Sequence, residues 1–263
     1  MFDALRVLSL VAAAVAVLAV PAAADAPAYR AEFALSFLGI TVARVDFDSH
    51  VDGDGYAVKG QVASAGLGAF FYDTHGTLTA SGRFGDRVEA QAFRAEYSYN
   101  DKLTLVDIGF SDGNVVKVVN DPPLKKRGKD WVPIRAPDLK SVVDPVAATM
   151  IKADRLEDVC KGGARMFDGE LRADLKLSFV KMGTMSVRGF DGPTVTCGLK
   201  FTPAAGYRKG RRSLQYLSTK SRIVVTFAQI GETGVYAPIY ATIGTQIGTI
   251  TVRARRFEAL QAS

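Results

Sequence analysis

The sequence predicts an all-β protein, mainly antiparallel, built as a strongly curved sheet or barrel with one or two short helices. Five Asp-Gly dipeptides supply the positive φ angles that tight hairpin turns require. Between them lie short segments rich in Val, Ile, Phe, Tyr and Thr, many of which alternate apolar and polar residues. The dipeptides are Asp52-Gly53, Asp54-Gly55, Asp112-Gly113, Asp168-Gly169 and Asp191-Gly192.

The first predicted hairpin joins residues 29–37 to residues 41–49 about Gly39. In its second arm apolar residues alternate with charged ones: Ala43, Val45 and Phe47 against Arg44, Asp46 and Asp48. This period of two is typical of a strand that has one side in a core and the other in water.

The same pattern predicts further strands along the rest of the chain. We expect them at residues 56–64, 70–80, 87–99, 102–110, 114–119, 169–182, 194–201, 212–217, 221–230, 236–243 and 248–257. In 169–182 one face is expected to carry Leu171, Ala173, Leu175, Leu177 and Phe179.

Two segments interrupt the alternation. Residues 144–151 predict a short helix, in which Asp144 accepts hydrogen bonds from the free backbone N–H groups of the first turn and Pro145 takes the first helical position. We therefore interpret Asp144 as a cap and not as a catalytic acid.

Residues 121–137 are rich in proline and basic residues, which predicts a long surface connection. Each half alone would leave open sheet edges, so we expect one domain.

The start of the chain predicts export. An apolar run ends in Pro21-Ala22-Ala23-Ala24, which is typical of a cleavable secretory signal covering residues 1–24. The alternative is an uncleaved anchor, although the run is short for a bilayer span. The remainder, residues 25–263, is then a single β-rich domain in the periplasm.

In such an oxidising compartment Cys160 and Cys197, the two cysteines of the chain, predict one disulfide. A reactive thiol pair is the weaker alternative, because the sequence has no Cys-x-x-Cys.

Several of these segments together resemble a known group of exported bacterial proteins. They are Tyr29-Arg30-Ala31-Glu32-Phe33, Leu38-Gly39-Ile40, Val45-Asp46-Phe47, Asp144-Pro145, the stretch from Cys160 to Leu177, Pro238-Ile239 and Thr245-Gln246-Ile247-Gly248. The group is domain of unknown function 3108, and the resemblance implies a periplasmic β-rich protein without an assigned activity. A more distant likeness links the chain to the half-barrel sheets of lipoprotein carriers, which hold acyl chains on a concave apolar face. That likeness concerns the fold only.

A catalytic constellation is not apparent in the sequence. The two histidines, His50 and His75, lie in separate segments, and there is neither an HExxH motif nor a Gly-x-Ser-x-Gly elbow. We therefore predict no catalytic residue, no metal and no cofactor. An envelope hydrolase would need one of these histidines beside a carboxylate or hydroxyl in a cleft.

Two sets of residues are candidates for binding. An apolar or amphipathic ligand is predicted to contact a lip and an inner face formed by Leu67, Phe70, Phe71, Phe93, Tyr97 and Tyr99. The alternative for these aromatic residues is an ordinary core. An anionic surface is predicted to contact the basic cluster Lys125, Lys126, Arg127 and Lys129. Two further clusters are Arg208, Lys209, Arg211 and Arg212, and Arg253, Arg255 and Arg256, and solvated loops are the alternative for all three.

The sequence thus predicts a non-enzymatic exported protein that binds or carries an apolar or amphipathic component of the cell envelope, with a lipid as the candidate class. The alternative is an assembly or scaffold protein that acts through protein contacts, and an envelope hydrolase is the third hypothesis. The formal net charge is only +6, which does not indicate nucleic-acid binding.

Overall fold

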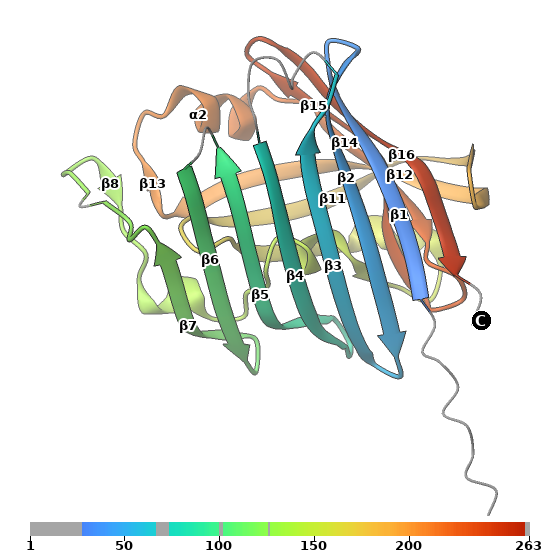
Figure 1. Cartoon of the computed structure of the whole chain (residues 1–263), viewed down its shortest axis with the longest axis horizontal. Helices are drawn as coiled ribbons and strands as arrows, with labels where there is room; N and C mark the ends of the chain where they lie inside the picture. The colour runs from blue at the N-terminus through green and yellow to red at the C-terminus, as the bar shows by residue number, and fades with distance from the viewer. Residues whose placement is uncertain (1–27, 67–73, 100–101, 126, 261–263) are drawn as a thin grey trace, which may run out of the picture.

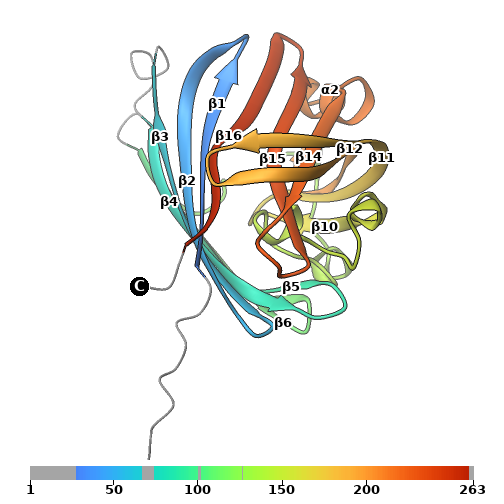
Figure 2. The same cartoon turned by 90° about the vertical axis from the view of Figure 1, so that its right-hand side faces the viewer.

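The computed structural model describes residues 28–66, 74–99, 102–125 and 127–260. The predicted signal segment, residues 1–24, lies outside these residues. The predicted fold class is confirmed: long antiparallel strands form one strongly curved sheet (Figures 1 and 2). Strands from both halves of the chain belong to that sheet, which runs in the order β10-β11-β12-β14-β15-β16-β1-β2-β3-β4-β5-β6-β7.

The strands of the first half follow one another as antiparallel neighbours. They are β1 (Ala28–Phe37), β2 (Ile40–Asp52), β3 (Gly55–Ser64), β4 (Thr74–Phe84), β5 (Val88–Tyr99), β6 (Lys102–Ser111) and β7 (Asn114–Asp121). The strands of the second half are β10 (Gly163–Phe167), β11 (Arg172–Val187), β12 (Phe190–Ala205), β14 (Ile223–Gln229), β15 (Val235–Thr245) and β16 (Gly248–Leu260). The last strand returns to pair with β1, so the two halves share one hydrogen-bonded ladder.

Turn residues with positive φ close the hairpins as their sequence requires. Leu38 and Gly39, at φ 50° and 85°, join β1 to β2, and Asp112 and Gly113, at 51° and 73°, join β6 to β7. Two successive positive φ angles are the property of type I′ turns, which match the twist of the strands they connect. The Asp191-Gly192 prediction is wrong in position. Both residues lie inside β12, because the turn forms three positions earlier, at Arg188-Gly189, where Gly189 has φ 81°.

The strand predicted at 212–217 is wrong, because this segment is the helix α2 (Arg212–Thr219). Leu214, which is buried, and Tyr216 fit a period of two, but Leu214 and Leu217 fit a helical period equally well. The pattern of so short a run cannot distinguish a strand from a helix. The packing of Leu214 against the rest of the protein favours the helix. Four short strands were not predicted: β8 (Trp131–Val132), β9 (Ile151–Lys152), β10 and β13 (Tyr207–Arg208).

The predicted helix after Asp144 is reduced to the 3-10 turn η2 (Ala147–Thr149). The predicted capping role is confirmed, since Asp144 Oδ1 accepts hydrogen bonds from the backbone N–H of Val146, at 2.7 Å, and of Ala147, at 3.0 Å. Two other 3-10 turns are η1 (Ala136–Leu139) and η3 (Leu156–Lys161).

The main core lies where these irregular segments fill part of the concave side of the sheet (Figure 2). Side chains from β3 to β6, such as Val58, Phe93 and Ile108, pack there against Val142 and Met150. A second cluster lies around the predicted disulfide, which is present: Cys160 of η3 and Cys197 of β12 have their Cα atoms 5.5 Å apart. A disulfide and buried cysteines fit a protein that is exported to an oxidising compartment.

In the face predicted for 169–182, Ala173 and Leu177 are buried in β11 as expected. Phe179 is 58 % exposed, because β11 projects beyond the elements that cover it and its residues 178–184 are exposed. Phe179 therefore does not share the burial of Ala173 and Leu177, with which it was predicted to share a face, and the exposed end of β11 offers an open strand edge.

Candidate functional site

The concave side of the sheet is not filled along its whole length. Next to the main core lies a cavity of about 640 Å³, between strands β16, β1 and β2 on one side and β12 and β15 on the other. Folded interiors contain few voids larger than a water molecule, whereas ligand cavities typically measure ~300–1,000 Å³. The size of this cavity is therefore that of a ligand site and not of a packing defect.

Alternation along the first hairpin produces the largest part of the lining. Phe33 and Leu35 of β1 lie beside Val45 and Phe47 of the neighbouring strand β2 on the concave side, with Phe33 and Phe47 edge to face at 6.0 Å between ring centroids. The other face of these strands is charged, so the register cannot slip by one residue without burying carboxylates. The alternation noted in the sequence thus fixes which side chains line the cavity.

The rest of the lining comes from strands far away in the sequence. Val252 and Phe257 of β16, Tyr236 of β15 and Ile230 after β14 complete an apolar lining. The lining also contains charged residues, including Asp191 and Glu258, which lie where the hairpin β11–β12 approaches β16. A mainly apolar cavity with a few charged groups at one side suits an elongated molecule that has an apolar body and a polar end.

The tip of the β11–β12 hairpin covers one side of the cavity, and Figure 2 shows this hairpin crossing in front of β14, β15 and β16. The backbone N–H of Phe257 donates to the carbonyl oxygen of Arg188 at 2.9 Å, and Phe190 packs on Phe257 with ring centroids 5.7 Å apart. Gly189 permits this approach, since a Cβ there would lie 2.2 Å from Cβ of Glu258. A side chain at this position would lift the tip from β16.

The floor of the cavity is the segment that Asp144 caps, through Val146, Thr149 and Met150. Asp144 itself is fully buried, and burial raises the pKa of its carboxyl to about 6, although hydrogen bonds from Ala147 and Val146 oppose this shift. Burial also raises the pKa of Tyr29 and of Tyr236, which both line the cavity. These hydroxyls are therefore neutral hydrogen-bonding groups in an apolar surrounding.

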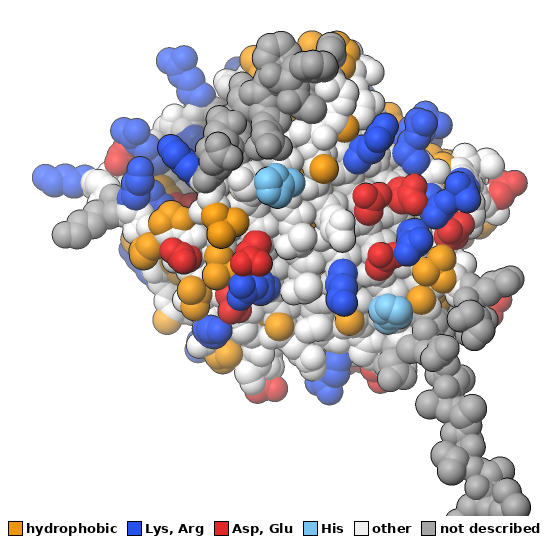
Figure 3. Space-filling model, viewed as in Figure 1, with side chains coloured by type: hydrophobic (Ala, Val, Ile, Leu, Met, Phe, Trp, Pro, Cys, Tyr) orange, Lys and Arg blue, Asp and Glu red, His pale blue; other side chains and the backbone are white. Residues whose placement is uncertain are grey.

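A second groove, of about 700 Å³, lies on the outer face of β16, β1, β2 and β3. Figure 3 shows this face as a mixture of acidic and basic side chains. The groove is lined by charges of both signs, and some are paired within the protein: Arg30 binds Asp48 at 2.7 Å, which raises the pKa of Arg30, and Glu32 binds Arg256 at 3.1 Å. Paired charges leave little potential for a ligand, so the apolar cavity is the stronger candidate site.

Two of the six residues predicted from sequence to bind a ligand have described side chains, Phe93 and Tyr97, and neither lines the apolar cavity. Phe93 is 6 % exposed and belongs to the main core, which is the alternative considered for it. Tyr97 is 42 % exposed and borders a smaller groove of about 460 Å³ beside His75. Tyr99 ends β5, and nothing is described of its side chain; Leu67, Phe70 and Phe71 lie outside the described residues.

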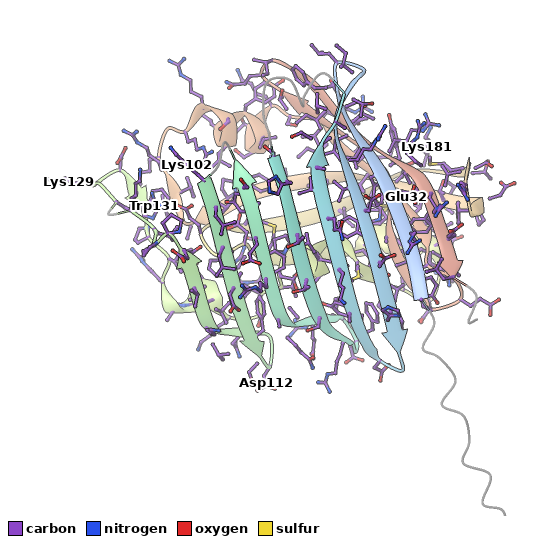
Figure 4. The ribbon with its side chains drawn as sticks, in the orientation of Figure 1. Glu32, Lys102, Asp112, Lys129, Trp131 and Lys181 are labelled. Atoms are coloured by element: carbon purple, nitrogen blue, oxygen red, sulfur yellow. A yellow bond between two sulfur atoms is a disulfide. The ribbon has the colours of Figure 1, made fainter. Side chains whose placement is uncertain are left out.

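The predicted basic cluster is placed at one end of the molecule (Figure 4). Lys125 and Lys129 are exposed, Arg127 pairs with Glu170 and lies over the Trp131 ring at 4.2 Å from its centroid, and Lys126 lies outside the described residues. The short ladder of β8 with β13 brings Trp131 opposite Arg208 of the second basic cluster. In the third basic cluster, Arg253 and Arg255 are exposed on β16, whereas Arg256 is paired with Glu32.

Neither histidine lies at the apolar cavity. His50 is exposed near the end of β2, and His75 is exposed on β4. Within the described ranges, no group of three or more His, Cys, Asp or Glu side chains is arranged to hold a metal ion. Among the same residues, no helix has the length and the apolar character needed to cross a bilayer.

Comparisons with known proteins give one family and one solved structure. The sequence profile of the family described as "Protein of unknown function (DUF3108)" matches residues 29–255. A crystal structure described as a β-barrel-like protein of domain of unknown function DUF1849 from Brucella abortus is 12 % identical, with a TM-score of 0.49, over 91 % of this chain and 100 % of that chain. No curated protein matches the chain.

Proposed function

The chain belongs to the DUF3108 family, and from that premise we propose that it is a non-enzymatic periplasmic binding protein for an elongated apolar or amphipathic molecule of the cell envelope. The observation that carries the proposal is the cavity of about 640 Å³ with its apolar lining. The acyl chain of the ligand lies between the wall formed by β16, β1 and β2 and the wall formed by β12 and β15, and its polar end lies beside the tip of the β11–β12 hairpin. The disulfide between Cys160 and Cys197 supports export, and the proposed role is that of a carrier or accessory factor.

The physical argument is the burial of apolar surface. Each methylene group removed from water contributes about 0.8 kcal/mol, so a chain of several methylenes gains enough free energy to overcome the cost of association. The sheet provides the cavity in advance, because hydrogen-bonded strands hold Phe33, Val45 and Phe47 in place without the ligand. Preformed walls lower the cost of ordering side chains on binding.

Filling the cavity from within tests the proposal. Ala31 lies on the concave side of β1 and lines the cavity, so Ala31→Phe places a ring in the space of the ligand. We expect affinity for a fluorescent fatty acid, measured by displacement, to fall at least about tenfold, since lost contact with two or more methylenes costs over 1.4 kcal/mol. The matched control is Ala34→Phe, on the outer face of the same strand.

The control variant should bind the fatty acid like the wild type. Native mass spectrometry of protein purified from its own periplasm gives an independent result, because the proposal expects a copurified amphipathic molecule. The proposal is wrong if the wild type takes up no fatty acid or lipid and carries only the mass of the polypeptide. Equal affinity of the two variants would place any binding outside the cavity.

An assembly role through protein contacts is a second candidate, favoured by the exposed end of β11. β10 pairs with β11 only along Arg172–Lys176, so one edge of the later residues is open within the described sheet. Phe179, Val180 and Met182 on this stretch are 58 %, 43 % and 40 % exposed. Open apolar edges are pairing sites for other strands.

A substitution on this edge distinguishes the assembly role from ligand binding in the cavity. If the edge is used for assembly, Phe179→Lys should abolish a crosslinked complex in periplasmic extract while fatty-acid binding is unchanged. Phe179→Lys that leaves every crosslinked species intact contradicts the assembly role. The Ala31→Phe variant serves as the reciprocal control, since it alters the cavity and leaves β11 intact.

A further inference from the structure

The two-stranded ladder of β8 and β13 concentrates the positive charge of the protein at one end. The described residues of the segments 125–132 and 207–212 include seven Lys or Arg residues and one Asp, a formal charge of +6, and the whole chain also carries +6. All other residues together are therefore close to neutral. Segments separated by more than seventy positions form one basic surface because Tyr207 pairs with Val132 and Arg208 with Trp131. We call this surface the basic ribbon.

Backbone contacts hold the basic ribbon in a defined shape. The N–H of Lys209 donates to the carbonyl oxygen of Asp130 at 2.7 Å, and the N–H of Gly206 donates to that of Val132 at 2.8 Å. Asp130 also binds the Arg208 side chain, and this contact lowers the pKa of the Asp130 carboxyl. The single acid of the ribbon is therefore used to hold its two strands together.

Most of the cations of the ribbon have no counterion. Arg208 and Arg127 are paired, but among the described residues no ion pair is formed by the exposed side chains of Lys125, Lys129, Lys209, Arg211 and Arg212. Arg211 and Arg212 also lie at the start of α2, whose first turn contains no acidic residue. The positive end of the helix dipole thus meets two cations, an unfavourable arrangement that an external anion relieves.

We propose that the basic ribbon is the docking surface of this protein on an anionic membrane. Each Lys or Arg near an anionic lipid surface contributes about 1 kcal/mol, and several free cations on one surface add up to stable but reversible attachment. Trp131 lies within the ribbon, half-buried, and tryptophan is enriched at the level of lipid headgroups. Exposed Leu124, at 46 %, adds an apolar contact beside it. The proposal does not depend on the ligand of the cavity.

Figure 4 shows Lys129 and Trp131 at the end of the molecule opposite to Lys181 on the β11–β12 hairpin. Docking through the ribbon would therefore leave that hairpin and the adjoining cavity away from the membrane surface. This orientation distinguishes the ribbon from the exposed end of β11 as the contact. It also lets membrane attachment and ligand uptake be measured separately.

Trp131 is the only tryptophan of the chain, so its fluorescence reports on the ribbon directly. With vesicles of phosphatidylcholine and phosphatidylglycerol that contain brominated lipid, we expect Trp131 emission to be quenched. Pure phosphatidylcholine vesicles should give no quenching, and raised salt should reverse it. The variant Lys125→Gln/Lys129→Gln/Lys209→Gln should bind the anionic vesicles about a hundredfold more weakly in a sedimentation assay.

The matched control is Lys59→Gln/Lys152→Gln/Lys181→Gln, which removes the same charge from exposed lysines on β3, β9 and β11. It should bind the vesicles like the wild type, and both variants should retain fatty-acid binding. Equal loss in the two variants, or sedimentation without any change in Trp131 emission, would overturn the ribbon as the docking surface. Binding to a soluble sulfated polysaccharide but not to vesicles would assign a glycan partner and overturn the membrane.

Discussion

Replacing Cys160 and Cys197 together by alanine is expected to lower the free energy of unfolding by about 4 kcal/mol. The bond links positions 37 residues apart, and its loss frees a long loop in the unfolded chain. Both side chains are buried, at 4 % and 0 % exposure, so the packing around η3 and β12 loses sulfur contacts as well. For a domain of this size the change corresponds to a melting temperature lower by about 10 °C.

Thermal unfolding followed by circular dichroism measures this shift. The wild type unfolded under reducing conditions should approach the stability of the double variant, because both then lack the same constraint. The single variant Cys197→Ala should be no more stable than the double variant, since it leaves one buried thiol unpaired. Free thiols in wild-type protein recovered from an oxidising compartment would contradict the disulfide and the argument for export.

Asp144 is expected to give the protein an unusual pH dependence. Its carboxyl is fully buried, and its pKa is raised from 3.8 to about 6. The folded-state pKa exceeds the unfolded value, so the folded state binds this proton more tightly than the unfolded chain does. The resulting contribution to the free energy of unfolding is fully present below pH 3.8 and is lost as the pH rises through about 6. The ionised carboxylate at neutral pH therefore costs about 3 kcal/mol relative to the protonated group.

The variant Asp144→Asn removes this titration but keeps an oxygen that accepts hydrogen bonds from Val146 and Ala147. Urea unfolding across this pH range should show the wild type losing about 3 kcal/mol relative to the variant on going from acid to neutral pH. Asp112→Asn, on the exposed β6–β7 turn, is the matched control for the loss of one carboxylate. A constant difference between wild type and Asp144→Asn at all pH values would contradict the raised pKa.

A buried tyrosine next to this carboxyl reports on the same environment. Neither Asp144 Oδ2 nor the hydroxyl of Tyr56 has a hydrogen-bond partner among the described residues. Burial, and to a lesser extent the charge of Asp144, raises the pKa of Tyr56. Tyr56 thus stays protonated while Asp144 titrates, so the pH dependence should belong to the carboxyl alone.

The sequence predicts which strand faces avoid water, but not which of those faces line the cavity. The alternation of Val45 and Phe47 with Asp46 and Asp48 shows which side of β2 avoids water, and the structure confirms it. Whether that side meets a solid core or a cavity depends on residues of β15 and β16, about 200 positions further on. No local pattern reports how far apart two such walls stand. For this reason the sequence predicts a binding role for aromatic residues such as Phe93, whereas the residues that line the cavity are Phe33 and Phe257.

Properties that depend only on neighbouring residues could be predicted from the sequence. Asp-Gly pairs place the β2–β3 and β6–β7 hairpins, alternation gives the strand faces, Asp144 is recognisable as a cap, and the two cysteines predict their bond. Tertiary structure alone decided that 212–217 is helical, that Phe93 is core, and that two distant basic segments meet at β8 and β13. The physical reason is that these outcomes depend on contacts between segments far apart, whose packing energies exceed the small differences in local propensity.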